Sequence, residues 1–142
     1  GPGRALSAAH RMGLDIEALT WKPADPASNA EVARHLAAAD VVVSTLPAGA
    51  ADPLAAVLDE AVGPAGGTRP GAVMLDVVYA PWPTPIAEAW DRGGGTVAPG
   101  WLMLLHQAVP QVRLMTGRQP DTEGMRAALL PVLATPSATN AD

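Results

Sequence analysis

The chain has no cysteine and only one lysine, Lys22, among its 142 residues. Without cysteine it forms neither disulfide bonds nor thiolate metal sites. Its three histidines lie far apart and lack partners at metal-ligand spacing, which predicts no metal site. The net charge is -5 and no basic cluster offsets it, so we expect no binding to nucleic acid or to membranes. No apolar run is long enough to cross a bilayer, and we predict a cytoplasmic protein.

The residues that are present indicate one globular domain. Hydrophobic residues make up 49% of the chain and charged residues 16%, which is enough apolar surface for one substantial core. We predict a single domain over residues 1–133. The remaining residues, 134–142, are rich in threonine, serine, proline and asparagine and are predicted to form a disordered tail.

Short apolar stretches alternate with segments of helical spacing along the chain. The unbroken apolar run at 41–45 is typical of a strand that is buried on both faces of a parallel sheet. Thr84 can cap a helix that has Pro85 at its first position, and Gly117 can end another helix. The alternation predicts an α/β fold in which helices cover both faces of a parallel sheet. The predicted strands are 16–21, 41–45, 72–76 and 96–98, and the predicted helices are 5–12, 29–38, 53–62, 84–92, 100–115 and 121–130.

The usual start of such a sheet is missing from the pattern. A doubly wound nucleotide-binding domain opens with a strand and a glycine-rich phosphate turn, whereas this chain opens with Gly1-Pro2-Gly3-Arg4 and a helical segment. The glycine run 93–95 follows a helix and precedes a strand, which is the reverse of the order that a phosphate site needs. We therefore expect a partial doubly wound, Rossmann-like sheet that lacks its first strands and belongs to a longer protein.

Two polar side chains near the ends of predicted strands are candidates for ligand contact. Tyr79 follows the third predicted strand, and Gln107 lies on the long helix that follows the fourth. At about 100° per residue, Gly100, Met103, Gln107 and Gln111 share a helical stripe roughly 80° wide. Glycine allows close approach of a ligand, and an amide both donates and accepts hydrogen bonds. The stripe suits a flat cofactor and a small polyhydroxy acid.

Each candidate also has an ordinary structural interpretation. Taken alone, Tyr79 is better explained by a packed ring with a solvated hydroxyl, and Met103 by flexible filling of the core. Thr45 and Pro47 can simply form a turn, although ligands bind beyond the carboxyl ends of parallel strands. Asp76 ends a predicted strand, where ordering of the following loop is favoured over a general-base role.

Several spaced motifs occur in an order that resembles one enzyme family. The run Asp76-Val-Val-Tyr79-Ala-Pro81 with Thr84, then Gly100-Trp-Leu-Met103-Leu with Gln107, then Thr116-Gly117, is similar to the C-terminal part of shikimate dehydrogenases. The segment Ser44-Thr-Leu-Pro-Ala-Gly49 resembles the loop after the fourth strand of that family's cofactor domain. The resemblance extends from residue 4 to residue 130, nearly the whole chain.

The resemblance implies an NADP-dependent oxidoreductase of aromatic amino acid and chorismate biosynthesis that interconverts 3-dehydroshikimate and shikimate. Residues 1–133 are then the remainder of the NADP-binding domain together with C-terminal helices. Tyr79 and Gln107 would contact the substrate. The implied cofactor-binding residues are Arg4 at the adenosine 2′-phosphate, Val77 and Gly100 at the nicotinamide end, and Thr45, Pro47 and Met103.

The chain also departs from the family pattern. The proton-transfer lysine and aspartate of the family lie in an N-terminal substrate domain, and Lys22 has no matching context, so we expect no catalytic residue in this chain and no activity from it alone. The family pattern also includes the segment Asn-Arg-Thr-x-x-Arg, and only its last arginine, Arg4, is present in this chain. Two alternatives remain open: a dehydrogenase of quinate or another cyclic hydroxy acid, and a non-catalytic Rossmann-like interaction domain. An exposed sheet edge also predicts a homodimer.

Overall fold

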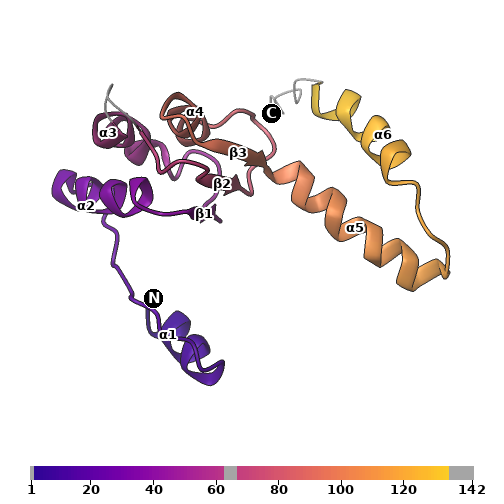
Figure 1. The fold of residues 1–142 in the computed structure, drawn as a ribbon, viewed down its shortest axis with the longest axis horizontal. Coiled ribbons are helices and arrows are strands. Elements are labelled where there is room, and N and C mark those ends of the chain that lie inside the picture. The colour runs from indigo at the N-terminus through magenta and orange to yellow at the C-terminus, as the bar shows by residue number, and fades with distance from the viewer. Residues whose placement is uncertain (1, 63–66, 135–142) are drawn as a thin grey trace, which may run out of the picture.

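The computed structural model describes residues 2–62 and 67–134, and its centre is a parallel sheet (Figure 1). The sheet contains β1 (Val41–Ser44), β2 (Val73–Asp76) and β3 (Thr96–Pro99) in the order β1-β2-β3. Both strand pairs are parallel, and the register aligns Ser44 with Asp76 and Asp76 with Pro99. The predicted α/β class and three of the predicted strands are therefore confirmed.

Six helices occupy the described residues, and each matches a predicted one. In Figure 1, α2, α3 and α4 lie side by side over the sheet, while α1 lies apart from it at the end of an extended segment. α5 leaves the sheet directly from the end of β3, and α6 runs back beside it. None of these helices is long and apolar enough to span a membrane. Their bounds are α1 (Pro2–Arg11), α2 (Pro26–Ala37), α3 (Asp52–Val62), α4 (Pro85–Arg92), α5 (Gly100–Thr116) and α6 (Thr122–Ala134).

The predicted strand at 16–21 is wrong. Residues 14–20 form no regular structure, and Ile16 and Leu19 are each 41% exposed. A strand needs a neighbour to satisfy its backbone groups, and among the described residues the sheet pairs only β1, β2 and β3. The end of the segment is instead held by side chains, because the Trp21 indole donates to Asn29 Oδ1 at 2.7 Å. An apolar run alone is therefore not enough to predict a strand of this sheet.

Helix α2 begins three residues earlier than predicted, because a different residue caps it. Asp25 is the N-cap, accepting from the Ala27 amide at 3.0 Å, and Pro26 occupies the first helical position. Ser28 and Asn29 lie inside the helix and are buried. Their side chains hold the preceding loop, since Ser28 Oγ accepts from the Lys22 amide at 3.0 Å.

The ends of α4 and α5 are as predicted. Thr84 caps α4, with Pro85 at the first position, and α5 ends at Gly117 in the left-handed conformation with φ of 67°. The predicted tail falls outside the described residues except for Ala134, which ends α6. The extent of the domain as 1–133 stays a prediction.

The hydrophobic core lies between the sheet and helices α2, α3 and α4. Leu58, Met74 and Trp90 are fully buried, and Val42 is 8% exposed. Neighbouring strand residues point to opposite faces, and Val41 and Val43 are 68% and 56% exposed. The prediction that this strand is buried on both faces is therefore wrong. β1 is an edge strand, and only its Val42 side faces the core.

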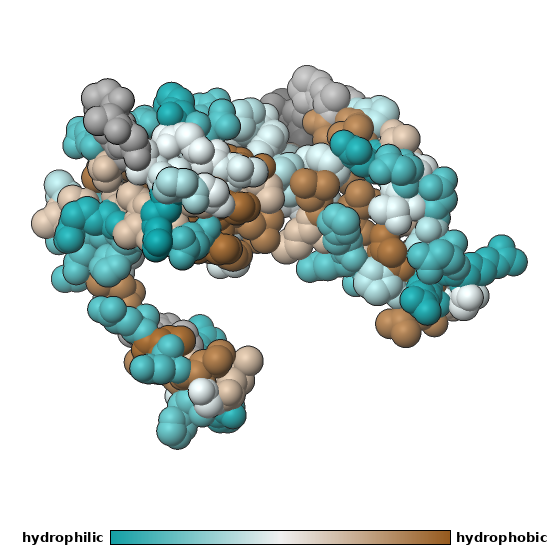
Figure 2. Space-filling model, viewed as in Figure 1, coloured by the Kyte–Doolittle hydropathy of each residue, from teal (hydrophilic) through white to brown (hydrophobic). Residues whose placement is uncertain are grey.

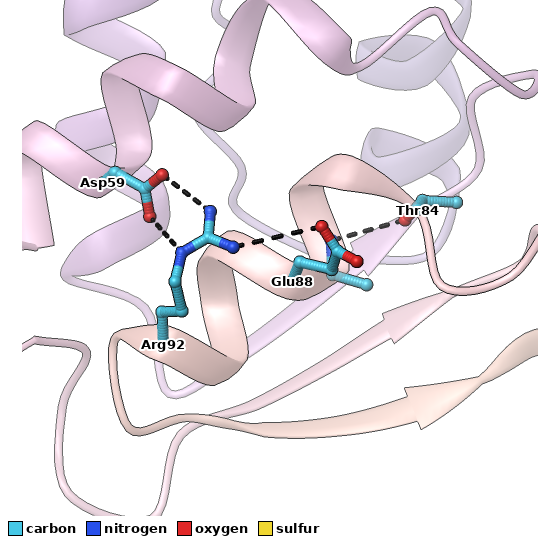
Figure 3. Close-up of polar contacts among 5 residues, drawn as sticks. Asp59, Thr84, Glu88 and Arg92 are labelled. Carbon is cyan, nitrogen blue, oxygen red and sulfur yellow. Dashed lines mark hydrogen bonds and ion pairs between the residues drawn. The ribbon is translucent and has the colours of Figure 1, made fainter.

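A surface ion pair joins α3 to α4 (Figure 3). The Arg92 guanidinium contacts both carboxylate oxygens of Asp59, at 3.1 and 2.7 Å, and Glu88 one turn earlier at 3.9 Å. The hydrogen bonds to Asp59 are the main reason that the pKa of Arg92 is raised. All three side chains are 40% or more exposed, so solvent screens the attraction and it mainly fixes the orientation of α4 against α3.

Candidate functional site at the carboxyl edge of the sheet

Most of the predicted site residues lie at one edge of the sheet. The three strands are parallel and in register, so the segments that follow Ser44, Asp76 and Pro99 emerge together. This is the edge where open α/β sheets bind ligands. Within three residues of a strand end lie five of the eight predicted residues: Thr45, Pro47, Val77, Tyr79 and Gly100.

The side chains at this edge differ in how accessible they are. Thr45 and Pro47 are exposed, Val77 is half-buried, and Tyr79 is 49% exposed. An apolar hollow of about 190 Å³ opens beside Thr45, and it is lined by Trp21, Leu46 and residues of α2, β1, α3 and α4. In Figure 2, hydrophobic surface is visible where β1 lies. The edge therefore offers both apolar surface and an accessible phenol.

A buried carboxyl group orders the loop after β2. Asp76 is 1% exposed, and its Oδ1 accepts from the Val78 amide at 3.2 Å while its Oδ2 accepts from the Thr84 hydroxyl at 2.6 Å. The predicted ordering role of Asp76 agrees with this geometry. The sequence indicated Thr84 as a helix cap and as part of the motif that begins at Asp76, but not its bond to Asp76. The signal in the sequence was that Thr84 follows Asp76 by eight residues, across a proline-rich turn that can bring the two together.

Gly100 is the point where β2 and α5 touch. A Cβ at this position would collide with the Val77 carbonyl oxygen and lie 2.5 Å from the Val77 carbonyl carbon and 2.9 Å from the Asp76 carbonyl oxygen. The close approach that glycine permits here is therefore between two parts of the chain itself. Contact between the Gly100 backbone and a cofactor stays a prediction.

The other three predicted residues lie farther from the sheet. Met103 is half-buried and Gln107 is exposed, one and two turns along α5 from Gly100. At 1.5 Å per residue, Gln107 lies about 10 Å along the helix axis from Gly100. Arg4 is exposed on α1, and the structure does not bring it to the edge (Figure 1). Contact of both Tyr79 and Gln107 with the substrate stays a prediction.

The polar side chains of the described residues form no metal centre. No group of three or more histidine, aspartate or glutamate side chains gathers closely enough there to hold an ion. The chemistry available at this edge is instead that of hydrogen-bonding groups on a rigid backbone beside apolar surface. Such a surface can bind and orient a ligand.

Comparison with known proteins identifies relatives of this chain. Residues 100–130 match a family model described as the shikimate 5′-dehydrogenase C-terminal domain. The NADP(+) shikimate dehydrogenase of Staphylococcus aureus strain JH9 is 31% identical over 103 residues, which cover 72% of this chain and 37% of that protein. The chain thus spans well under half the length of the curated relatives that it matches.

Solved structures give the same result. The crystal structure of Mycobacterium tuberculosis shikimate dehydrogenase is 34% identical, with a TM-score of 0.68, and the match covers 92% of this chain and 42% of that one. A shikimate 5-dehydrogenase from Mycobacterium fortuitum is 35% identical, with a TM-score of 0.62 and coverage of 89% and 41%. The likeness therefore includes the described α/β arrangement as well as the sequence.

Proposed function

We propose that this chain, which belongs to the shikimate dehydrogenase family through its C-terminal domain, is part of an enzyme that reduces 3-dehydroshikimate to shikimate with NADPH. One observation carries the proposal: the segments that follow β1, β2 and β3 emerge at the same edge of the sheet. At this edge the Val77 carbonyl packs against Gly100. Because the chain spans 37% of the S. aureus relative, the activity is proposed for the intact protein.

The residues at the edge fit the nicotinamide end of the cofactor. Val77 and Gly100 would provide backbone at the proposed ligand-binding edge, and Thr45 and Pro47 are accessible beyond the end of β1. Met103, half-buried on α5, would add apolar contact. These 142 residues contain no glycine-rich phosphate turn after a strand, so they account for only part of a dinucleotide site. Arg4 would meet the 2′-phosphate if α1 packs against the sheet in the intact protein.

NADPH would supply the hydride, and the substrate would be held by this chain's polar side chains. Tyr79 and Gln107 are both exposed and carry groups that hydrogen-bond to hydroxyl or carboxylate oxygens. They would orient the ring rather than transfer a proton. In the family, proton transfer is the role of a lysine and an aspartate that have no counterparts in this chain. The direct test is the oxidation of NADPH by the intact protein with 3-dehydroshikimate. The same assay with 3-dehydroquinate tests the alternative substrate. No oxidation with either substrate would contradict the proposal and favour a non-catalytic domain.

Replacement of Gln107 tests the substrate contact. Gln107→Ala in the intact protein should raise KM for shikimate by about fivefold, because a net hydrogen bond contributes about 1 kcal/mol. Steady-state kinetics measure the change. Gln119→Ala is the matched control, since Gln119 is an exposed amide beyond the end of α5 and outside the stripe. Unchanged affinity and turnover in Gln107→Ala would show that the amide does not touch substrate.

The exposed edge of β1 supports self-association of the 142-residue chain. An edge strand with free backbone groups and exposed apolar side chains such as Val41 and Val43 pairs readily with another strand. Sedimentation velocity over a range of concentrations should show dimers or larger species. A Val43→Lys variant should weaken the association, since a charge on an edge strand opposes pairing. A wild-type monomer at high concentration would contradict this expectation.

A further inference from the structure

The loop after β2 is held by a buried carboxyl group that forms no ion pair within the described part of the chain. Asp76 is 1% exposed, and none of the ion pairs found among residues 2–62 and 67–134 includes it. Buried aspartates are rare unless hydrogen bonds satisfy them. Here the Thr84 hydroxyl donates at 2.6 Å, a separation typical of a hydroxyl bound to a carboxylate. The Val78 amide donates to the other oxygen at 3.2 Å.

Asp76 therefore fixes both ends of the loop that joins β2 to α4. Its Oδ1 holds the start of the loop at Val78, and its Oδ2 holds the end at Thr84. Thr84 is 6% exposed, and its Oγ1 also accepts from the Ala87 amide at 3.3 Å. The single hydroxyl proton of Thr84 is thus committed to Asp76. The start of α4 and the end of β2 become one hydrogen-bonded unit.

The backbone of Val77 is fixed from two further directions. Its amide donates to the Ser44 carbonyl of β1 at 3.0 Å, and its carbonyl packs against Gly100 at the start of α5. The side chains that follow remain accessible, since Val77 is half-buried and Tyr79 is 49% exposed. A rigid backbone that presents accessible side chains is what a ligand-contacting segment requires.

We infer that Asp76 and Thr84 are positioning residues that set the place of Val77 at the cofactor and of Tyr79 at the substrate. The inference rests on the proposed function for its kinetic consequence. Both side chains are buried, so both act through the segment that they hold. Loss of the Asp76–Thr84 bond would release the loop between Val78 and Thr84 while the sheet and α3 keep their packing.

The test compares variants of Thr84 in the intact protein. Thr84→Val keeps the shape and removes the hydroxyl, and kcat/KM should fall by about tenfold to a hundredfold, as small misplacements of binding groups do. Thr84→Ser restores the donor and should stay within about threefold of wild type, since the hydrogen bond contributes most of the effect. Asp76→Ala, which removes both carboxylate acceptors, should lower kcat/KM as Thr84→Val does and serves if that variant does not fold.

Thr68→Val is the matched control. Thr68 is also 6% exposed, and its hydroxyl donates to the Gly93 carbonyl at 3.2 Å, before β2 rather than after it. It should lose stability like Thr84→Val and keep wild-type kcat/KM. Equal kinetics in Thr84→Val and Thr68→Val would overturn the inference.

Hydrogen exchange separates this inference from the proposed function. The Val78 amide should exchange at least tenfold faster in Thr84→Val than in wild type, and Thr68→Val should leave it unchanged, because protection follows local opening. This measurement needs no substrate. An inactive wild type would contradict the proposed function, whereas unchanged Val78 exchange in Thr84→Val would overturn the positioning role.

Discussion

Gly100→Ala is expected to destabilise the folded protein by about 3 kcal/mol, the upper end of the range for overpacked sites. The added methyl group would lie 2.5 Å from the carbonyl carbon of Val77 and 2.9 Å from the carbonyl oxygen of Asp76. These are backbone atoms of β2 and the following loop, and they cannot rotate away as a side chain can. Relief requires that α5 move away from the sheet. Urea unfolding of wild type and variant measures the loss.

Gly3→Ala is the control for the same change of residue. Gly3 is in α1, and a Cβ there would meet no atom within 4 Å. Alanine favours a helix over glycine by about 1 kcal/mol, so this variant should be as stable as wild type or slightly more stable. If Gly100→Ala were as stable as Gly3→Ala, the contact between Val77 and Gly100 would not exist in solution. The glycine would then be free for the ligand role that the sequence suggested.

The sequence predicted the elements that local chemistry defines. The cap at Thr84 with Pro85, and the left-handed end at Gly117, depend on residues within one turn of the helix end. Strands β1, β2 and β3 were equally visible, because each is a short apolar run followed by a turn or helix. What local patterns could not supply was the neighbour of each strand. Residues 16–21 look like a strand, and no strand among the described residues pairs with them.

The sequence predicted where the candidate site lies in the fold, but not the contacts that its residues make. Parallel strands put Thr45, Tyr79 and Gly100 at one edge, and this follows from the β-α-β pattern alone. The reason for glycine at position 100 did not follow, because a helix pattern does not show which backbone lies against it. The bond from Thr84 to Asp76 was hidden for the same reason, since it depends on how the loop folds back.

Trp90→Ala is expected to cost about 4 kcal/mol, within the usual range for a tryptophan removed from a core. Trp90 is fully buried on α4 and belongs to the core cluster with Leu58 and Met74. Its ring also packs on Gly95, where a Cβ would lie 2.6 Å from the ring atom Cδ1. No other side chain among the described residues can fill this volume by rotation alone, because the neighbours are themselves packed. Urea unfolding followed by circular dichroism measures the loss.

Trp90→Phe separates packing from hydrogen bonding at the same position. The buried Nε1 of Trp90 finds no acceptor in the described part of the chain, so phenylalanine removes volume without breaking a bond. We expect it to cost about 1–2 kcal/mol, well below alanine, because most of the aromatic volume remains. Trp82→Ala, at a half-buried tryptophan in the loop before α4, should also cost less than Trp90→Ala. If Trp90→Phe were as damaging as Trp90→Ala, the indole N–H would have a partner in solution, and Trp90 would stabilise the core through that bond.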